Sequence, residues 1–147
     1  MGLIENDVFV CFDCETTGLD TENDKIIEIG AATFQGGTIL KSCEDLINPG
    51  IAIPINTIEI HHITNEMVLN KPKIDSVINH YLEFIGKHII VGHGVTFDIS
   101  ILNSEAKRLN INTQLEKLKY VDTLRLARLY GESPSNSLQS LRKHFNI

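Results

Sequence analysis

A short apolar segment near the start of the chain runs directly into two acidic residues and a tight turn. Residues 8–12 (VFVCF) are rich in β-branched and aromatic side chains, which predicts a strand buried on both faces and ending at Asp13. Asp13 and Glu15 are two positions apart, so the strand period places both carboxylates on one face. Because a strand buried on both faces needs neighbours, we expect it to be central in a sheet.

Hydrophobic periodicity predicts the other elements. A second strand over residues 26–34 is followed by a glycine hairpin, Gln35-Gly36-Gly37, into a third strand that begins at Thr38, which makes an antiparallel meander. The pattern further predicts helices over 74–85, 97–109, 124–130 and 138–145, strands at 88–92 and 120–121, and a loop in or beside 61–64. Since the later strands are reached through helices, the chain is predicted to form an α/β fold, a mixed sheet flanked by helices.

Composition limits the possible functions. The 147 residues fit one domain, and a net charge of −6 argues against a protein that grips long duplexes through a basic stripe. The N-terminus has no basic start or cleavage site, and no apolar run is long enough for a membrane span, so we expect a cytoplasmic protein with no membrane contact. Six basic residues are interpreted as scattered surface charges and not as a basic patch: Lys107, Arg108, Lys117, Lys119, Arg125 and Arg128.

The cysteines do not indicate a zinc or redox site. Cys11 and Cys14 form a C-x-x-C, but a strand points them to opposite faces, and only Cys43 remains as a further cysteine ligand. We therefore interpret all three as free core thiols.

The acidic residues carry the chemistry. Two neighbouring carboxylates are unfavourable unless a cation lies between them, and Mg²⁺ or Mn²⁺ prefers such oxygens. An isolated D-x-E is nevertheless more typical of two solvated side chains at a strand end. Asp98 is predicted to open a helix, either as its cap or as a metal ligand, and the preceding Gly-His-Gly favours the ligand. Asp122 is better interpreted as a helix cap.

Four segments, in order, resemble the motifs of the DEDD exonucleases, the superfamily that includes the proofreading epsilon subunit of bacterial DNA polymerase III. The segment 13–18 (DCETTG) resembles the first motif, and 61–64 (HHIT) is similar to H-G-I-T, with His62 in place of glycine. Residues 91–98 (VGHGVTFD) resemble G-H-N-x-x-F-D, with Gly94 in place of asparagine, and 122–128 (DTLRLAR) also matches. The resemblance covers the chain from Val8 onward.

This resemblance implies a ribonuclease H-like fold with five strands and a 3′–5′ exonuclease of the DEDDh type. It implies that Asp13, Glu15 and Asp98 are catalytic and hold two Mg²⁺ or Mn²⁺ ions. The expected substrate is the 3′ end of DNA, preferably single-stranded, cut at terminal phosphodiesters to release nucleoside 5′-monophosphates, with a polymerase subunit as a possible partner. Residues expected to bind or lie near the terminal nucleotide are Thr16, Thr17, Gly18, His61, His93 and Phe97.

One motif of the superfamily, H-x-x-x-x-D on a last helix, is absent from this sequence. The late histidine, His144, falls in the preceding predicted helix. We interpret residues 1–147 as a single exonuclease domain without its C-terminal helix, and expect weak or no nuclease activity, since loss of a general base costs about 10²–10⁴ in rate. Two alternatives remain: a non-catalytic module that binds metal and 3′ ends beside a polymerase, and an exonuclease acting on RNA.

Overall fold

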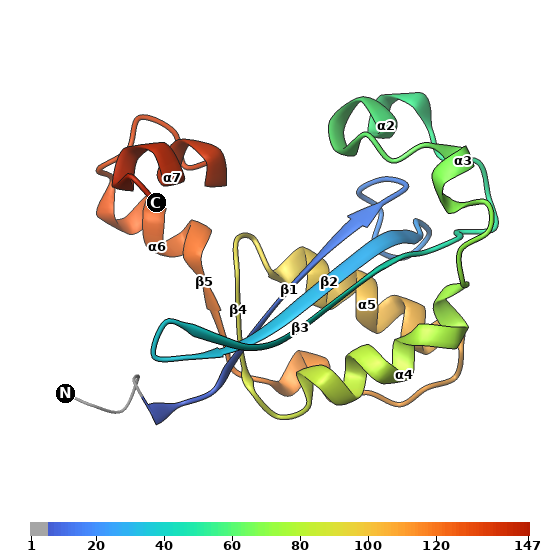
Figure 1. Ribbon diagram of the computed structural model, residues 1–147, viewed down its shortest axis with the longest axis horizontal. Coiled ribbons are helices and arrows are strands. Elements are labelled where there is room, and N and C mark those ends of the chain that lie inside the picture. Colours follow the sequence, from blue (N-terminus) through green and yellow to red (C-terminus); the bar gives the residue numbers. More distant parts are fainter. Residues whose placement is uncertain (1–5) are drawn as a thin grey trace.

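A computed structural model describes residues 6–147. Residues 1–5, on which the expected absence of a signal sequence partly rests, lie outside the described part. The centre of the molecule is a five-stranded sheet in the order β3-β2-β1-β4-β5 (Figure 1). Its strands are β1 (Phe9–Thr16), β2 (Ile26–Gln35), β3 (Thr38–Leu46), β4 (Ile89–Gly92) and β5 (Tyr120–Asp122).

The sheet is mixed, as predicted. β1, β2 and β3 pair antiparallel as a meander, and the hairpin between β2 and β3 turns at Gly36 and Gly37, which both have positive φ. β4 pairs with β1, and β5 with β4, in parallel. β1 is the middle strand, also as predicted.

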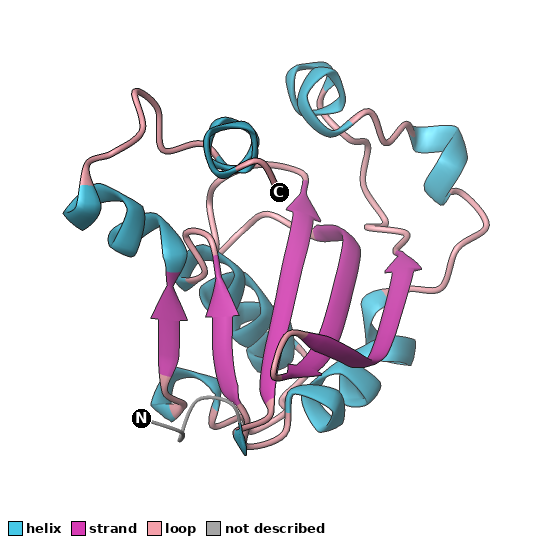
Figure 2. Ribbon diagram, turned by 60° about the vertical axis from the view of Figure 1, so that its left-hand side comes forward, coloured by secondary structure: helices cyan, strands magenta, loops and turns pink. Residues whose placement is uncertain are grey.

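Two helices bury one face of this sheet. α4 (Ile74–Ile85) and α5 (Thr96–Arg108) lie behind the strands in Figure 2, and their apolar side chains form one core with the even-numbered residues of β1. Each fully buried side chain of this kind contributes roughly 1.5–3 kcal/mol. The core includes Val10, Phe12, Ile78, Tyr81, Ile85, Ile101 and Leu102.

The prediction that the first strand is buried on both faces is wrong. Burial alternates along β1: Val10, Phe12 and Cys14 are buried, whereas Cys11 and Glu15 are only partly buried and Asp13 is exposed. The helices that pack on the sheet cover the even-numbered face, so the odd-numbered face keeps access to solvent. The strand also continues past Asp13 to Thr16, because β2 pairs with it throughout. Cys11 and Cys14 lie on opposite faces, as predicted.

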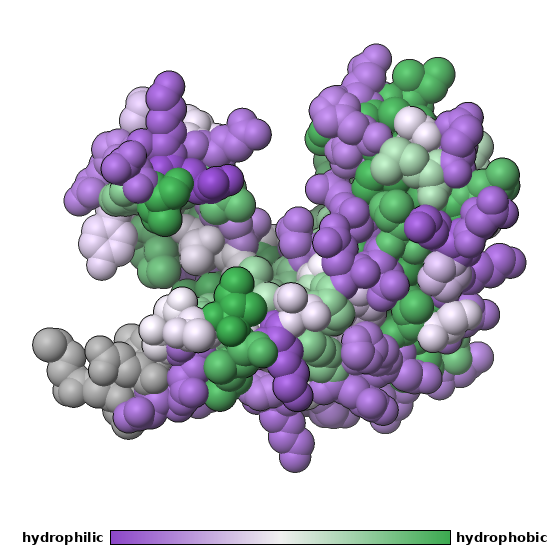
Figure 3. All heavy atoms as spheres, in the orientation of Figure 1, coloured by the Kyte–Doolittle hydropathy of each residue, from purple (hydrophilic) through white to green (hydrophobic). Residues whose placement is uncertain are grey.

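Two separate helical units flank the carboxyl end of β1. One contains α2 (Ile55–His61) and α3 (Asn65–Val68); the other contains α6 (Thr123–Tyr130) and α7 (Leu138–Phe145). The space-filling view in Figure 3 shows a deep opening between these units above the sheet. A short 3₁₀ helix, η1 (Leu115–Lys117), precedes β5. Within residues 6–147, no helix has the length and apolar character needed to cross a membrane.

The segment around His61 lies beside a loop over residues 62–64, as predicted, although the short helix before it was not expected. His61 is the last residue of α2, and His62 ends the helix in the left-handed conformation with φ 62°. That conformation favours glycine, which explains why a glycine suits this position in the similar H-G-I-T motif. Ile53, Ile63 and Val68 then pack with Ile27 in a small second core that attaches α2 and α3 to the sheet.

Candidate active site

Asp98 reaches the strand that carries the other two candidate ligands. It lies in the first turn of α5, and its Oδ1 accepts a hydrogen bond of 2.9 Å from the backbone N–H of Cys14. β4 pairs with β1 only as far as Cys11, so the Cys14 N–H has no strand partner on that side. The bond therefore holds Asp98, only 5% exposed, against the part of β1 between Asp13 and Glu15.

The three carboxylates disfavour one another's charged forms. Burial raises the pKa of Asp98 to about 7, and the nearby Asp13 and Glu15 add to the rise. Partial loss of hydration likewise raises the pKa of Asp13, although its side chain reaches solvent, and that of Glu15, which Asp13 repels further. Within residues 6–147, none of the three forms an ion pair with a Lys, Arg or His. A bound cation would remove this unfavourable charge interaction.

The sequence reasoning missed one more acid. Glu28 on β2 lies directly opposite Glu15 in the antiparallel pair, a like-charge position that is destabilising in a sheet. Burial raises its pKa, and the neighbouring Glu44 and Asp13 raise it further. Only the register of the β1–β2 pair brings Glu28 here, and no local motif signals that register.

The donor chemistry of this site fits Mg²⁺ or Mn²⁺, because all candidate donors are carboxylate oxygens. The ligand cage is not closed, however: over residues 6–147, no three His, Cys, Asp or Glu side chains converge tightly enough to hold an ion. One oxygen of Asp98 is already occupied by the Cys14 N–H. Ligation by Asp13, Glu15 and Asp98 together would therefore require their side chains to draw closer.

A hollow of about 370 Å³ lies beside Glu15. It is within the usual size range of small-ligand sites. One wall comes from the end of β1 and the following turn, with Thr16, Gly18 and Leu19. The other wall comes from α2, with Asn56, Thr57, Ile60 and His61. Two sets of residues distant in sequence thus meet next to a candidate metal ligand.

His61 is set up as a hydrogen-bond donor. Its Nδ1 accepts from the backbone N–H of Ile63 at 3.0 Å, so the neutral ring carries its proton on Nε2. That Nε2 is buried and has no partner among the described residues. Burial lowers the pKa of His61, which favours the neutral ring. A ligand in the hollow would supply the missing acceptor.

The threonine hydroxyls of the first motif form hydrogen bonds within the protein. Thr16 Oγ1 donates to the Gly18 carbonyl at 2.6 Å. Thr17 Oγ1 donates to Asp24 Oδ1 at 2.8 Å and accepts from the Lys25 N–H at 3.0 Å. At Gly18, a Cβ would collide with the Asp24 carboxylate, so any larger residue would displace that side chain from its hydrogen bonds. Thr16 and Gly18 line the hollow, and no local sequence pattern indicated that Asp24 contacts Thr17 and Gly18 behind it.

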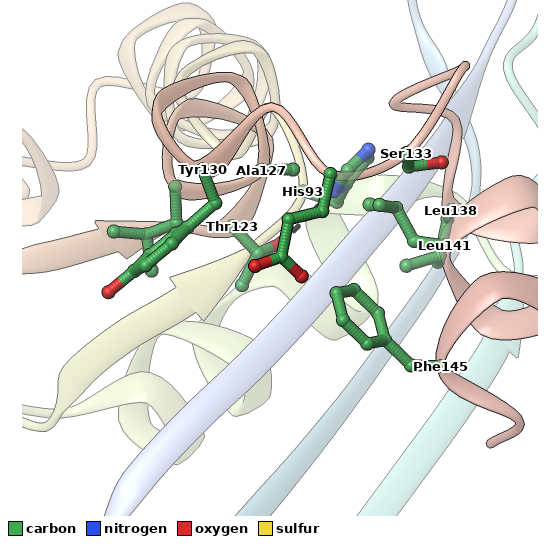
Figure 4. A pocket seen from close by; sticks show the side chains of 10 residues that line it. His93, Thr123, Ala127, Tyr130, Ser133, Leu138, Leu141 and Phe145 are labelled. Atoms are coloured by element: carbon green, nitrogen blue, oxygen red, sulfur yellow. Dashed lines mark hydrogen bonds between the residues drawn. The ribbon is translucent and has the colours of Figure 1, made fainter.

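His93 lies between two segments of the protein. Its Nδ1 is 3.0 Å from Thr123 Oγ1 and its Nε2 is 2.8 Å from the carbonyl oxygen of Asn136, so both ring nitrogens are occupied. Figure 4 shows it at the edge of an apolar hollow of about 500 Å³, with Tyr130 of α6 and Phe145 of α7 on opposite sides. His93 therefore connects the loop before α5 to the start of α6 and to the segment before α7.

The loop after His93 depends on Asp122. Asp122 Oδ1 accepts from Leu124 N, which makes it the N-cap of α6 as predicted, and also from Gly94 N, each at 2.9 Å. Gly94 has φ 76°, a conformation that asparagine tolerates better than most residues. Phe97, expected near the substrate, is half-buried against the main core.

Comparison with known proteins identifies the family. A family model described as "Exonuclease" (RNase T) matches residues 10–147. The chain is 38% identical over 146 residues to a DNA polymerase III of PolC type from Bacillus subtilis, covering 99% of the chain but 10% of that protein. It is 43% identical over 101 residues to a DNA polymerase III subunit epsilon from Treponema pallidum, covering 69% of the chain and 47% of that protein. The chain thus spans about a tenth of the PolC-type relatives.

Solved structures share the fold. Exonuclease X in complex with 5′ overhanging duplex DNA superposes with a TM-score of 0.72 at 27% identity, covering 95% of this chain and 74% of that one. Product-bound exonuclease I gives a TM-score of 0.81 at 18% identity, covering 93% and 38%. The resemblance inferred from the four motifs is therefore confirmed over nearly the whole sequence, and the chain belongs to the exonuclease family.

Proposed function

We propose that this chain forms the nuclease core of a metal-dependent 3′–5′ exonuclease that removes nucleotides from DNA ends as nucleoside 5′-monophosphates. One observation carries the proposal: Asp98 is fixed on β1 beside Asp13 and Glu15, with no cationic partner in the described chain. A divalent ion would offset the repulsion between these carboxylates, and such ions activate water and stabilise the leaving oxygen in phosphodiester hydrolysis.

Each residue of the site then has a role. Asp13, Glu15 and Asp98 would hold Mg²⁺ or Mn²⁺. The hollow beside Glu15 would receive the terminal nucleotide, where the Nε2–H of His61 donates to an acceptor on its sugar or phosphate. The turn at Gly18 gives the hollow its outer wall.

Neither His61 nor His93 offers a free nitrogen to accept a proton from water. His61 Nδ1 is bonded to Ile63 and its Nε2 carries the proton, while both nitrogens of His93 are bonded. This predicts that residues 1–147 alone hydrolyse DNA more slowly than an exonuclease with a general base, by about 10²–10⁴. The same observation favours the second candidate, a module that binds metal and 3′ ends without cutting.

The polymerase III relatives suggest replication proofreading as the setting, with a polymerase subunit as partner. The substrate we propose is single-stranded DNA at a 3′ end. A net charge of −6 fits a short contact of this kind, because a long duplex contact requires many basic residues. RNA remains the alternative substrate.

The test measures binding and hydrolysis together. The unmodified chain should bind Mn²⁺ and thymidine 5′-monophosphate in calorimetry and slowly shorten a 5′-labelled single strand from its 3′ end. Asp13→Ala should weaken Mn²⁺ binding by roughly 100-fold and remove hydrolysis. Asp75→Ala, on the exposed surface of α4, is the matched control.

Each outcome separates the candidates. Unchanged Mn²⁺ binding and hydrolysis in Asp13→Ala refutes the site. Binding of metal and nucleotide without any release of nucleotides supports the non-catalytic module, and equal shortening of an RNA strand supports the RNA exonuclease.

A further inference from the structure

In the turn between β1 and β2, the side chain of Asp24 joins the end of β1 to the middle of the turn. Its Oδ1 accepts from the Thr17 hydroxyl and its Oδ2 accepts from the backbone N–H of Asp20, both at 2.8 Å. Gly18 packs directly against the same carboxylate. The position of Asp24 therefore decides where Gly18, and with it this wall of the hollow beside Glu15, can lie.

Arg108, at the end of α5, fixes this turn from outside. Its Nη1 donates to the Glu22 carbonyl at 2.6 Å and its Nη2 donates to the Asp24 carbonyl at 2.9 Å. Arg108 was predicted to be one of several scattered surface charges, and that interpretation is wrong for this residue. Its guanidinium bridges the backbone of the turn to the helix that also carries Asp98.

Glu105 holds Arg108 in place. It is 2% exposed, and its Oε1 lies 2.9 Å from Arg108 Nη2 while its Oε2 accepts from Arg108 Nε at 3.3 Å. Glu105 Oε1 also accepts from the N–H of Ile26, the first residue of β2, at 3.3 Å. The pair thus contacts Glu22, Asp24 and Ile26, which together cover the end of the turn and the start of the strand.

The hydrogen bonds of the Arg108–Glu105 pair are more specific in direction than stabilisation of the fold requires. A buried ion pair is often no more stabilising than apolar side chains of the same volume. The planar guanidinium of arginine, in contrast, sets the directions of several hydrogen bonds at once, which lysine cannot reproduce. Placement matters at a site that binds substrate, because an error of about 1 Å there can cost about 100-fold in rate.

We propose that the Arg108–Glu105 pair is a positioning device for nucleotide binding: it fixes the β1–β2 turn, and so sets the affinity of the hollow beside Glu15 for the terminal nucleotide. This inference rests on the proposed function, since it concerns the nucleotide site of the same centre. It predicts that the pair affects nucleotide binding and leaves metal binding by the carboxylates unchanged.

The experiment uses the whole chain and two titrations for each variant. Calorimetry measures the Kd of Mn²⁺ alone, and then the Kd of thymidine 5′-monophosphate at saturating Mn²⁺. Arg108→Lys keeps the positive charge and loses the planar guanidinium. It should raise the Kd of the nucleotide about tenfold, while the Kd of Mn²⁺ stays within about twofold. Glu105→Gln keeps an acceptor for Arg108 and should raise the Kd of the nucleotide only about threefold. Lys107→Ala, exposed and adjacent on α5, should match the unmodified chain.

Hydrogen exchange shows whether the variants act through the turn. The amide of Lys25, which donates to Thr17 Oγ1, should lose protection in Arg108→Lys while the amides of α4 keep theirs. Equal nucleotide affinity in Arg108→Lys and the unmodified chain overturns the inference, as does an equal loss of Mn²⁺ and nucleotide affinity, which indicates general structural damage. Failure of the unmodified chain to bind nucleotide overturns the proposed function as well.

Discussion

The two sides of the candidate site are held in opposite ways. On the α5 side, Asp98 and Glu105 are buried and bonded to the backbone of β1 and β2. On the other side, neither α6 nor α7 has a buried residue, and Leu129, Tyr130 and other apolar side chains remain exposed. The difference teaches that burial of charged groups fixes the acidic centre, whereas the C-terminal helices are attached by a few hydrogen bonds around His93.

The largest expected effect is in local stability. The slowest-exchanging amides of α7 should exchange about 10⁴ times faster than the slowest-exchanging amides of α5, because opening α7 exposes little buried apolar surface. Hydrogen exchange followed by mass spectrometry or NMR measures this. Similar protection factors in α5 and α7 would remove the contrast between the two sides.

A second effect should be confined to the α5 side and depends on pH. The pKa of Asp98 is raised to about 7, so without metal the folded protein binds a proton more tightly than the unfolded chain. The contribution of Asp98 to stability is therefore complete below about pH 4 and is lost as the pH rises through 7, by up to about 4 kcal/mol. Urea unfolding of the metal-free protein at pH 5 and pH 8 tests this.

Asp98→Asn is the control for that measurement. It keeps an oxygen for the Cys14 N–H and cannot ionise, so its stability should change less between the two pH values. Adding Mn²⁺ at pH 8 should restore stability to the unmodified chain and not to the variant. A pH dependence as steep in Asp98→Asn would assign the effect to other acids.

The third effect concerns the link between the two sides. His93→Ala removes the contacts with Thr123 and Asn136, and should reduce the opening free energy of α6 and α7 by about 1–2 kcal/mol. Exchange in α5 and the Kd of Mn²⁺ should stay unchanged. If Mn²⁺ binding weakens as much as in Asp13→Ala, the two sides are not independent.

The smallest effect is expected at the junction of the two sides. Gly94 has φ 76°, and a Cβ there would make ordinary contact with Leu124 at 3.7 Å. Gly94→Asn should therefore change the free energy of unfolding by less than about 0.5 kcal/mol, whereas Gly94→Val should lower it by about 1–2 kcal/mol. Thermal unfolding of both variants measures the difference. Equal losses would show that space, and not backbone conformation, restricts this position.

Local patterns predicted those parts of the fold that carry a strong signal of their own. The helix over 74–85 has a regular apolar face and coincides with α4, and Asp122 caps α6 as expected. α2 was missed because it has only seven residues after Pro54 and one buried side chain. The length of β1 was underestimated, since Asp13 to Thr16 have the composition of a turn and are extended only through pairing with β2.

The site was predictable only where motifs mark it. The sequence pointed to Asp13, Glu15 and Asp98, and the structure places the Asp98 carboxylate of α5 against the Cys14 N–H, between the other two. Glu28 and the Arg108–Glu105 pair were missed because they act through strand register and contacts across about 80 residues of sequence. Asp24 was missed although its contacts are local, because no motif marks it. Charge alone could not distinguish Arg108 from its exposed neighbour Lys107.

The spacing of Asp98 and Glu105 has a consequence for how this domain can vary. Seven residues correspond to nearly two turns, so both carboxylates face the sheet about 10.5 Å apart along the helix axis. Inserting or deleting one residue between them would rotate one carboxylate by about 100° and leave a strand N–H unpaired. The residues between Asp98 and Glu105 can therefore be substituted, but their number cannot change.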